Sequence, residues 1–275
     1  MGTSGVTPSR AFIFVYASLS LASSAPLLRA MDLKEIEARG SIRALVSADE
    51  QPEMFALTPG LESAPGFERE ILDSFAKAHG LKVDVTTVAR FDQIIPTLVR
   101  GDGDLIIGII DTETRRKQIG FTAETLPARH LVVTRRPAPT IDDAETMKKA
   151  HFGVIVGTSW AEAATAAGIP IANTTQFPDL PRVLSALQAG KIAATVMSCP
   201  DFALAQKRDG ALQGGLFLGT PNSAAWGVRK TDKALNDALN EHIASLRGSR
   251  AWSQLVAKYF TPDALDLFRR ARGPQ

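Results

Sequence analysis

Short apolar runs alternate with amphipathic stretches along most of the 275-residue chain. The run at 105–110, LIIGII, has almost no polar face, which is typical of a strand covered on both sides in a parallel sheet. Helix-period stretches separate most of these runs, and this alternation predicts an α/β fold with right-handed crossovers. The predicted strands are 41–46, 81–88, 105–110, 128–134, 152–156, 171–174, 192–197, 214–218 and 224–229.

The alternation is interrupted twice, and these interruptions predict two lobes. The strand 128–134 runs into a proline-containing segment at 135–139, which we interpret as a crossover, and 219–222 (GTPN) reads as the crossover back. We therefore expect a two-lobed α/β fold, each lobe a mostly parallel sheet flanked by helices, joined by two hinge strands. A ligand-binding cleft and hinge closure follow from such a shape. The predicted boundaries are 41–135 plus 222–272 for lobe 1, and 136–221 for lobe 2.

The N-terminus has the order of a secretory signal peptide. One charge at Arg10 precedes the apolar run 11–21, and small residues follow at 22–25. This order predicts a signal peptide at 1–25 with cleavage near residues 24–25. The alternative is an uncleaved N-terminal anchor. No other segment approaches membrane-spanning length, so we expect a soluble protein that is periplasmic or otherwise secreted.

Composition and net charge exclude several classes of partner and site. A formal net charge of +2 is too small to indicate a nucleic-acid partner. The single cysteine, Cys199, excludes an internal disulfide and a cysteine-rich zinc site, and the four histidines have no ligand spacing. No recognisable catalytic constellation is present, so we expect a protein that is not an enzyme and needs no metal or cofactor.

Two short segments carry the candidate binding chemistry. Asp111 or Thr112 can cap a helix directly after the strand 105–110, and Arg115 lies in its first turn. Ligands of open α/β sheets bind beyond the carboxyl ends of strands, and the arginine fork matches a carboxylate. In the second lobe the turn Gly157-Thr158-Ser159 opens a helix, whose free N–H groups favour an anion.

Several segments, in this order and spacing, carry a family resemblance. They are Gly66-Phe67-Glu68, Ile95–Leu98, Gly103–Ile107, Thr112–Thr122, Gly157–Ser159, Ala186–Ile192 and Trp252–Phe260. Over about residues 40–262 the chain resembles the family-3 periplasmic solute-binding proteins, typically polar amino-acid receptors of ABC transporters. The resemblance implies a monomer that closes on a small carboxylate-bearing solute, an amino acid or related organic acid, and delivers it to an ABC permease. It also implies that Arg115 holds the ligand carboxylate, with Thr158 contributing from lobe 2.

The chain departs from the family pattern at the other half of the site. Ser198 stands where the family usually has the aspartate that pairs with the ligand's ammonium, and glutamates replace the usual aromatics of the first loop. Glu50, Glu53 or Asp201 could supply the missing negative charge. If the glutamates are solvated instead, the ligand need not be an α-amino acid. For the cleft wall Phe55 is the candidate aromatic, with Trp160 and Trp226 as alternatives.

Two other function classes remain open at this stage. One is a ligand-binding sensor or regulatory module that uses the same fold without transport. The other is a dehydratase-type enzyme derived from the fold, in which Glu50, Glu53 or Glu68 would act as general acid. Binding for uptake is the function that the motifs favour.

Overall fold

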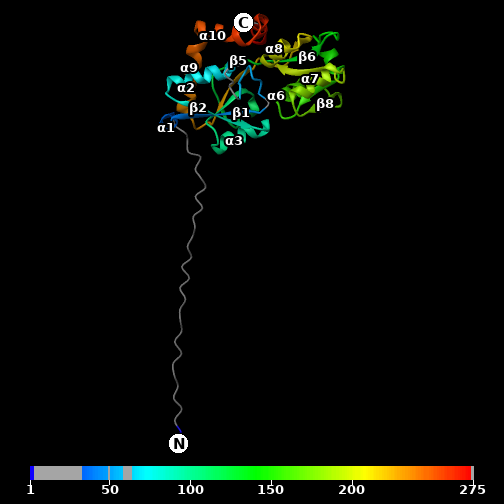
Figure 1. Ribbon diagram of the computed structural model, residues 1–275. Coiled ribbons are helices and arrows are strands. Elements are labelled where there is room, and N and C mark those ends of the chain that lie inside the picture. Colours follow the sequence, from blue (N-terminus) through cyan, green and yellow to red (C-terminus); the bar gives the residue numbers. More distant parts are fainter. Residues whose placement is uncertain (3–32, 49, 58–63, 274–275) are drawn as a thin grey trace.

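The computed structural model describes residues 1–2, 33–48, 50–57 and 64–273. The predicted signal peptide therefore lies, apart from its first two residues, outside the described residues. The described part forms two lobes, each built on one mixed β-sheet flanked by helices (Figure 1). The two-lobed α/β fold expected from the sequence is confirmed.

The first sheet contains the early strands and one late strand. Its order is β2-β1-β3-β11-β4, and β5 also pairs with β11. Strand β1 is parallel to β2 and β3, whereas β11 is antiparallel to β3, β4 and β5. The strands are β1 (Ser41–Ser47), β2 (Lys82–Val88), β3 (Leu105–Ile110), β4 (Gly120–Phe121), β5 (Leu126–Pro127) and β11 (Ser223–Val228).

The second sheet has the order β10-β6-β9-β7-β8. Strand β7 is parallel to β8 and β9, while β6 is antiparallel to β9 and β10. The segment 171–173, expected to begin a strand, forms a 3-10 turn before β8. The strands are β6 (His130–Arg135), β7 (Phe152–Ile155), β8 (Thr174–Phe177), β9 (Ala194–Ser198) and β10 (Leu212–Phe217).

Two details of the predicted organisation are wrong. Strand β6 belongs to the second sheet, so the first crossing lies at Ala128 and Arg129 rather than after Arg135. The sheets are also mixed rather than mostly parallel, because β6 and β11 enter from the other lobe and run antiparallel to their neighbours. The predicted return to the first lobe before β11 is where the structure places it. The two crossings lie side by side, since Ala128 N donates to Asn222 O at 2.8 Å.

Helices cover both sheets. In the first lobe α2 packs against β2, α9 and α10. Helix α8, which follows β9 of the second sheet, packs against α11 of the first lobe near β5. In the second lobe α6 and α7 pack on β7 and β9. The helices are α1 (Leu33–Arg39), α2 (Phe67–Ala78), α3 (Ile94–Arg100), α4 (Glu113–Arg116), α5 (Ala144–Lys149), α6 (Ser159–Ala166), α7 (Leu180–Gln188), α8 (Cys199–Arg208), α9 (Lys233–Arg247), α10 (Arg250–Tyr259) and α11 (Pro262–Ala271), with 3-10 turns at Phe91–Gln93 and Ile171–Asn173.

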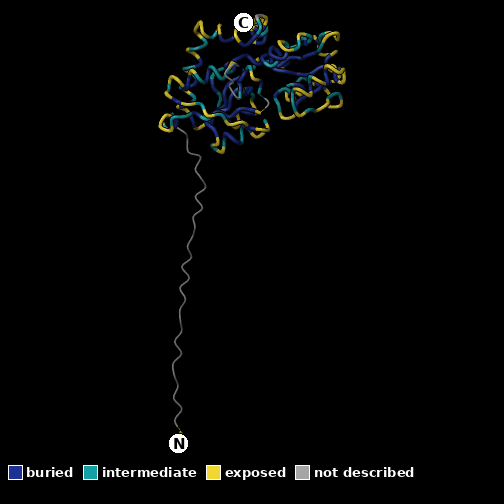
Figure 2. The backbone as a smooth tube through the Cα atoms, viewed as in Figure 1, coloured by how far each residue is buried: buried dark blue, intermediate teal, exposed yellow. Residues whose placement is uncertain are grey.

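Apolar side chains form the interior of both lobes, and most of the strand positions are buried (Figure 2). Phe67 at the start of α2 makes edge-to-face contacts with Trp252 and Phe260, with ring centroids 5.3 and 5.5 Å apart. Such pairs stabilise beyond the area they bury. They fasten the C-terminal helices to the first lobe, next to the glycine Gly66, whose φ is +105°.

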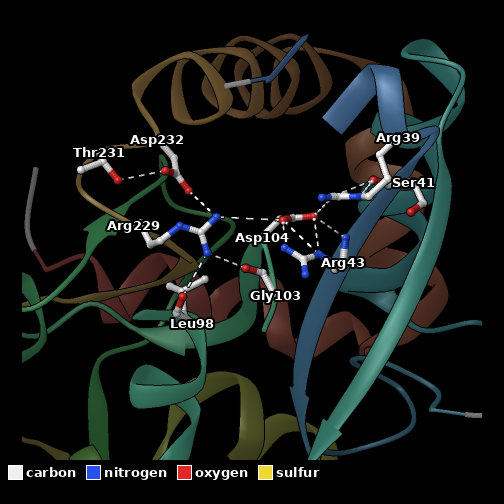
Figure 3. A network of polar contacts seen from close by, with 9 residues as sticks. All are labelled: Arg39, Ser41, Arg43, Leu98, Gly103, Asp104, Arg229, Thr231 and Asp232. Carbon is white, nitrogen blue, oxygen red and sulfur yellow. Dashed lines mark hydrogen bonds and ion pairs between the residues drawn. The ribbon is translucent and has the colours of Figure 1, made fainter. Parts of the chain in front are cut away.

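A buried charge network lies at the amino end of β3 (Figure 3). Asp104 is fully buried and accepts hydrogen bonds from Arg43 N and Arg43 Nη2, each at 2.8 Å, and from Arg39. Arg229, directly after β11, lies 4.0 Å from Asp104 and 2.7 Å from Asp232. The network joins β1, β3 and β11 at the edge of the sheet opposite to the carboxyl ends of β1 and β3, so its role is structural.

Candidate functional site

A cavity of about 530 Å³ lies between the two lobes. The residues lining it follow the carboxyl ends of the parallel strands of both sheets, β1, β2 and β3 on one side and β7, β8 and β9 on the other. This is the position that the topology of open α/β sheets favours for a ligand. The polar and charged side chains in its wall are Ser47, Glu50, Gln51, Arg90, Asp92, Arg115, Thr158, Ser159, Asp179, Ser198 and Asp201.

Arg115 provides a buried positive charge in this wall. The turn after β3 positions it, because the Thr112 hydroxyl accepts from Arg115 N at 3.3 Å and begins α4. Its guanidinium lies 5.1 Å from the centre of the Phe91 ring, and Nη1 donates to Ile110 O at 2.8 Å. Burial lowers the pKa of Arg115, although the group stays charged. Among the residues that the structure describes, no other hydrogen bond engages the guanidinium, so its remaining N–H groups can bind an anion.

The amino end of α6 forms part of the wall across the cleft. Thr158 begins this helix: its hydroxyl accepts from Ala161 N at 3.3 Å and donates to Ile155 O at 2.8 Å. Gly157 has a φ of +75°, which lets the chain turn sharply from β7 into the helix. Ser159 is buried and lines the cavity. Capping and anion binding use the same end of the helix, so the two functions are compatible.

Of the four carboxylates in the wall, Glu50 and Asp201 come from opposite lobes and interact with each other. Burial raises the pKa of Glu50 to about 8, and the neighbouring charge of Asp201 adds to this effect. Burial also raises the pKa of Asp201, which accepts from Gln51 Nε2 at 2.6 Å and from the Ser198 hydroxyl. A desolvated carboxylate pair of this kind is stabilised by a cation.

Ser198 is buried, lines the cavity and begins α8. Its hydroxyl accepts from Asp201 N at 3.4 Å. One helical turn therefore separates Ser198 from the carboxylate of Asp201, and both line the same cavity. Asp201 thus brings a carboxylate to the cavity wall beside Ser198.

The structure brings six of the eight predicted site residues to the cavity: Glu50, Arg115, Gly157, Thr158, Ser159 and Ser198. Phe55 is fully buried in the core of the first lobe and is not on the wall, because its loop turns inward before α2. The Asp111 side chain pairs with Arg116, whose Nε lies 2.6 Å from Asp111 Oδ1, and is likewise not on the wall.

Of the alternative site residues named from the sequence, some line the cavity and others do not. Glu53 pairs with Arg208 of α8 at 3.1 Å rather than lining the cavity. Trp160 lines it, whereas Trp226 is fully buried and donates its Nε1–H to Glu68. Glu68 is buried among these groups, and burial raises its pKa to about 7.

Three residues near the cavity are not among the site residues predicted from the sequence. Phe91 follows β2, and the expectation that ligands sit beyond strand ends could have identified it. Gln51 contacts Asp201 and also accepts from Arg208 Nη1 at 2.9 Å. His130 is buried at the first position of β6 and lies 3.0 Å from Ser159 Oγ. The proximity of His130 to Ser159 could be predicted only by placing β6 in the second sheet.

The described residues contain no group of three or more His, Cys, Asp or Glu side chains that could hold a metal ion. Cys199 is buried, as expected, and its thiol donates to Pro127 O at 3.0 Å. Within the same part of the chain, none of the helices has the length and apolar character that crossing a bilayer requires.

Comparison with known proteins identifies the family. The profile of the bacterial extracellular solute-binding proteins, family 3, matches residues 42–262, which cover both sheets. The chain belongs to this family.

Individual relatives differ in what their names describe. A probable histidine-binding protein of Neisseria gonorrhoeae is 25% identical over 204 residues, which cover 72% of this chain and 75% of the relative. A membrane-bound lytic murein transglycosylase F of Ectopseudomonas mendocina is 25% identical over 202 residues, covering 71% of this chain but 41% of that enzyme. This chain is thus similar to most of the length of one protein named for binding and to less than half of another named for transglycosylase activity.

A solved structure of the substrate-binding protein of an amino acid ABC transporter is similar over both lobes. It superimposes with a TM-score of 0.68 at 28% identity and covers 80% of this chain and 99% of its own. The similarity supports the two-lobed arrangement.

Proposed function

We propose that this protein is an extracytoplasmic binding protein that closes its two lobes on a small zwitterionic solute of the amino-acid type and delivers it to an ABC permease. Arg115 carries the proposal, as the carboxylate-binding group of the site. The predicted signal peptide and family membership support a location outside the cytoplasm, periplasmic or secreted.

Arg115 is held ready for an anion. Its guanidinium is buried, and no carboxylate of the described residues lies within ion-pair distance of it, although the charge of Glu162 acts on it from farther away. A desolvated arginine without such a partner is costly, and a ligand carboxylate in bidentate contact would remove that cost. The α6 amino end, with the Thr158 cap and the Ser159 hydroxyl, supports the same negative group from the second lobe.

The opposite charge of the ligand is assigned to the carboxylate pair. Glu50 comes from the first lobe and Asp201 from the second, so a cation between them would also hold the lobes together. A ligand with one carboxylate and one ammonium group matches both kinds of charge in the wall, Arg115 and the Glu50–Asp201 pair. This argument favours an amino acid over a simple organic acid, and the histidine-binding relative and the amino acid transporter protein agree with that choice.

Isothermal titration with the twenty amino acids and with matched amine-free carboxylic acids tests the proposal. Arg115→Ala should weaken binding by on the order of 2–5 kcal/mol, because it leaves the ligand carboxylate without its partner. Arg116→Ala is the matched control, since Arg116 is exposed and pairs with Asp111 outside the cavity. Equal affinities in the wild type and the Arg115→Ala variant would contradict the assignment.

One observation favours a second candidate. Glu50 is protonated near neutral pH and faces a cavity, which is what a general acid of a dehydratase-type enzyme requires. Incubation of cyclic hydroxy acids with the protein, followed by NMR and compared with Glu50→Gln, distinguishes the two. Product formation that depends on Glu50 would replace binding by catalysis as the proposed function.

A further inference from the structure

A chain of three polar side chains connects the hinge with the cavity. Asn222 Nδ2 lies 3.2 Å from His130 Nδ1, and His130 Nε2 lies 3.0 Å from Ser159 Oγ. His130 and Ser159 are buried, with 4% exposure each. The imidazole is therefore the link between two residues that belong to different structural elements.

The three hydrogen-bonded residues lie in three different parts of the fold. Asn222 lies in the second crossing, directly before β11, and His130 is the first residue of β6, directly after the first crossing. Backbone hydrogen bonds join the crossings, with Leu218 N donating to His130 O at 2.8 Å. Ser159 begins α6 and lines the cavity. The three side chains thus connect both crossings with the wall of the cavity.

The protonation state of the imidazole decides which group donates in each of these two hydrogen bonds. Burial and the positive charge of Arg115 lower the pKa of His130 to about 4, so the ring is neutral. The Asn222 amide donates to Nδ1, which places the single ring proton on Nε2, and Nε2–H donates to Ser159 Oγ. Because the Ser159 hydroxyl accepts from Nε2, it keeps its own proton. It can donate this proton to an acceptor in the cavity, which Ser159 lines.

We propose that His130 is a positioning residue that couples the conformation of the two hinge crossings to the orientation of Ser159 in the ligand cavity. The coupling itself does not depend on the identity of the ligand. Its consequence for affinity rests on the proposed binding function, in which Ser159 donates its hydroxyl proton to the ligand anion.

The side chain can be dissected with three substitutions. In His130→Asn the amide reaches about as far as Nδ1 and keeps the contact with Asn222. In His130→Gln the amide reaches about as far as Nε2 and keeps the contact with Ser159. His130→Ala removes both contacts. His151→Ala is the control, because His151 is exposed and its side chain lies 2.8 Å from Thr175 Oγ1, within the second lobe.

The first arm uses the ligand-free protein and hydrogen exchange. Asn222→Ala should increase amide exchange in the segment 158–163 by about two-fold or more, the lower range of coupling within one hydrogen-bonded network. The same substitution in a His130→Ala or His130→Gln background should add nothing there. An equal increase in all backgrounds, or none in the wild type, would overturn the proposal. Circular dichroism confirms that each variant is folded.

The second arm measures affinity for L-histidine by titration. Asn222→Ala and Ser159→Ala should be non-additive in the wild-type background, the double variant binding within about two-fold of the weaker single variant. In the His130→Ala background their effects should multiply, and multiplication in both backgrounds contradicts the ligand role. If L-histidine does not bind at all, that result counts against the proposed ligand class, while the exchange experiment still decides on His130.

Discussion

Glu50 and Asp201 approach one cavity from opposite lobes, and the charge of Asp201 adds to the burial that raises the pKa of Glu50 to about 8. The pair therefore carries less negative charge at neutral pH than two free carboxylates would. A cation that enters the cavity reverses this, because it stabilises the ionised form.

Binding of a zwitterionic or cationic ligand should therefore release a proton from Glu50. The affinity should rise as the pH increases toward about 8 and then level off, by at most about ten-fold per pH unit for one proton. Calorimetry in buffers of different ionisation enthalpy counts the protons. Glu50→Gln should abolish the release, and proton uptake by the wild type would contradict the assignment.

Glu68 should make the stability of the first lobe pH-dependent. Its carboxyl accepts from Thr125 Oγ1 at 2.7 Å and from Trp226, but burial dominates and raises the pKa from 4.5 to about 7. The folded state therefore holds a proton that the unfolded state has lost, so this contribution is complete below pH 4.5 and disappears as the pH rises to about 7.

The measurement is urea unfolding of the wild type and Glu68→Gln between about pH 5 and pH 8. The wild type should lose on the order of 3 kcal/mol at most across this range through Glu68, and the glutamine variant should lose less. Parallel curves for the two proteins would show that Glu68 is not the group responsible.

Asp104 should be essential to the stability of the first sheet. The carboxylate is fully buried and joins Arg39, Arg43 and Arg229, so Asp104→Ala removes the shared partner of the partly buried Arg39 and Arg43 and leaves the buried Arg229 with Asp232 alone. We expect a loss of about 3–5 kcal/mol in the free energy of unfolding. Asp102→Ala is the matched control: its side chain is 55% exposed and pairs with Arg100, and the loss should stay below about 1 kcal/mol. Similar losses would contradict a structural role for the network.

Gly66 should not tolerate alanine. A Cβ at this position would lie 2.7 Å from Met54 O and 2.8 Å from Phe55 Cα, and the φ of +105° disfavours any side chain. Because the obstructing atoms are backbone, Gly66→Ala should cost about 1–3 kcal/mol or more, visible as a lower Tm. At Gly210 a Cβ meets no atom within 4 Å, so Gly210→Ala should leave the Tm nearly unchanged. Equal Tm values for the two variants would refute the steric argument.

Most helices and strands, and the position of Arg115 in the site, could be predicted from the pattern of apolar residues. The strand at 105–110 is apolar on both faces, and a cavity forms beyond the carboxyl ends of such strands, which placed Arg115 correctly in its wall. The sheet to which β6 belongs was not predictable in this way, because a short apolar strand is compatible with either sheet.

The remaining errors come from side-chain direction and from spacing. Phe55 looked like a cleft aromatic by position, but the turn before α2 points it into the core. Asp201 was only one of three alternatives, because the length of β9 and the exact start of α8 decide whether a carboxylate three residues after Ser198 reaches the cavity. Long-range contacts such as that of His130 with Ser159 leave no periodicity in the chain.

The position of β11 in the first sheet has a consequence for the order of folding. This strand lies between β3 and β4, yet it follows the whole of the second lobe in the chain. The second sheet needs only the continuous segment 130–217, whereas the first sheet cannot close until residues 223–228 have joined it. Pairing over such sequence separations is slow. The nascent chain can thus complete its second lobe while its first lobe still has an open centre.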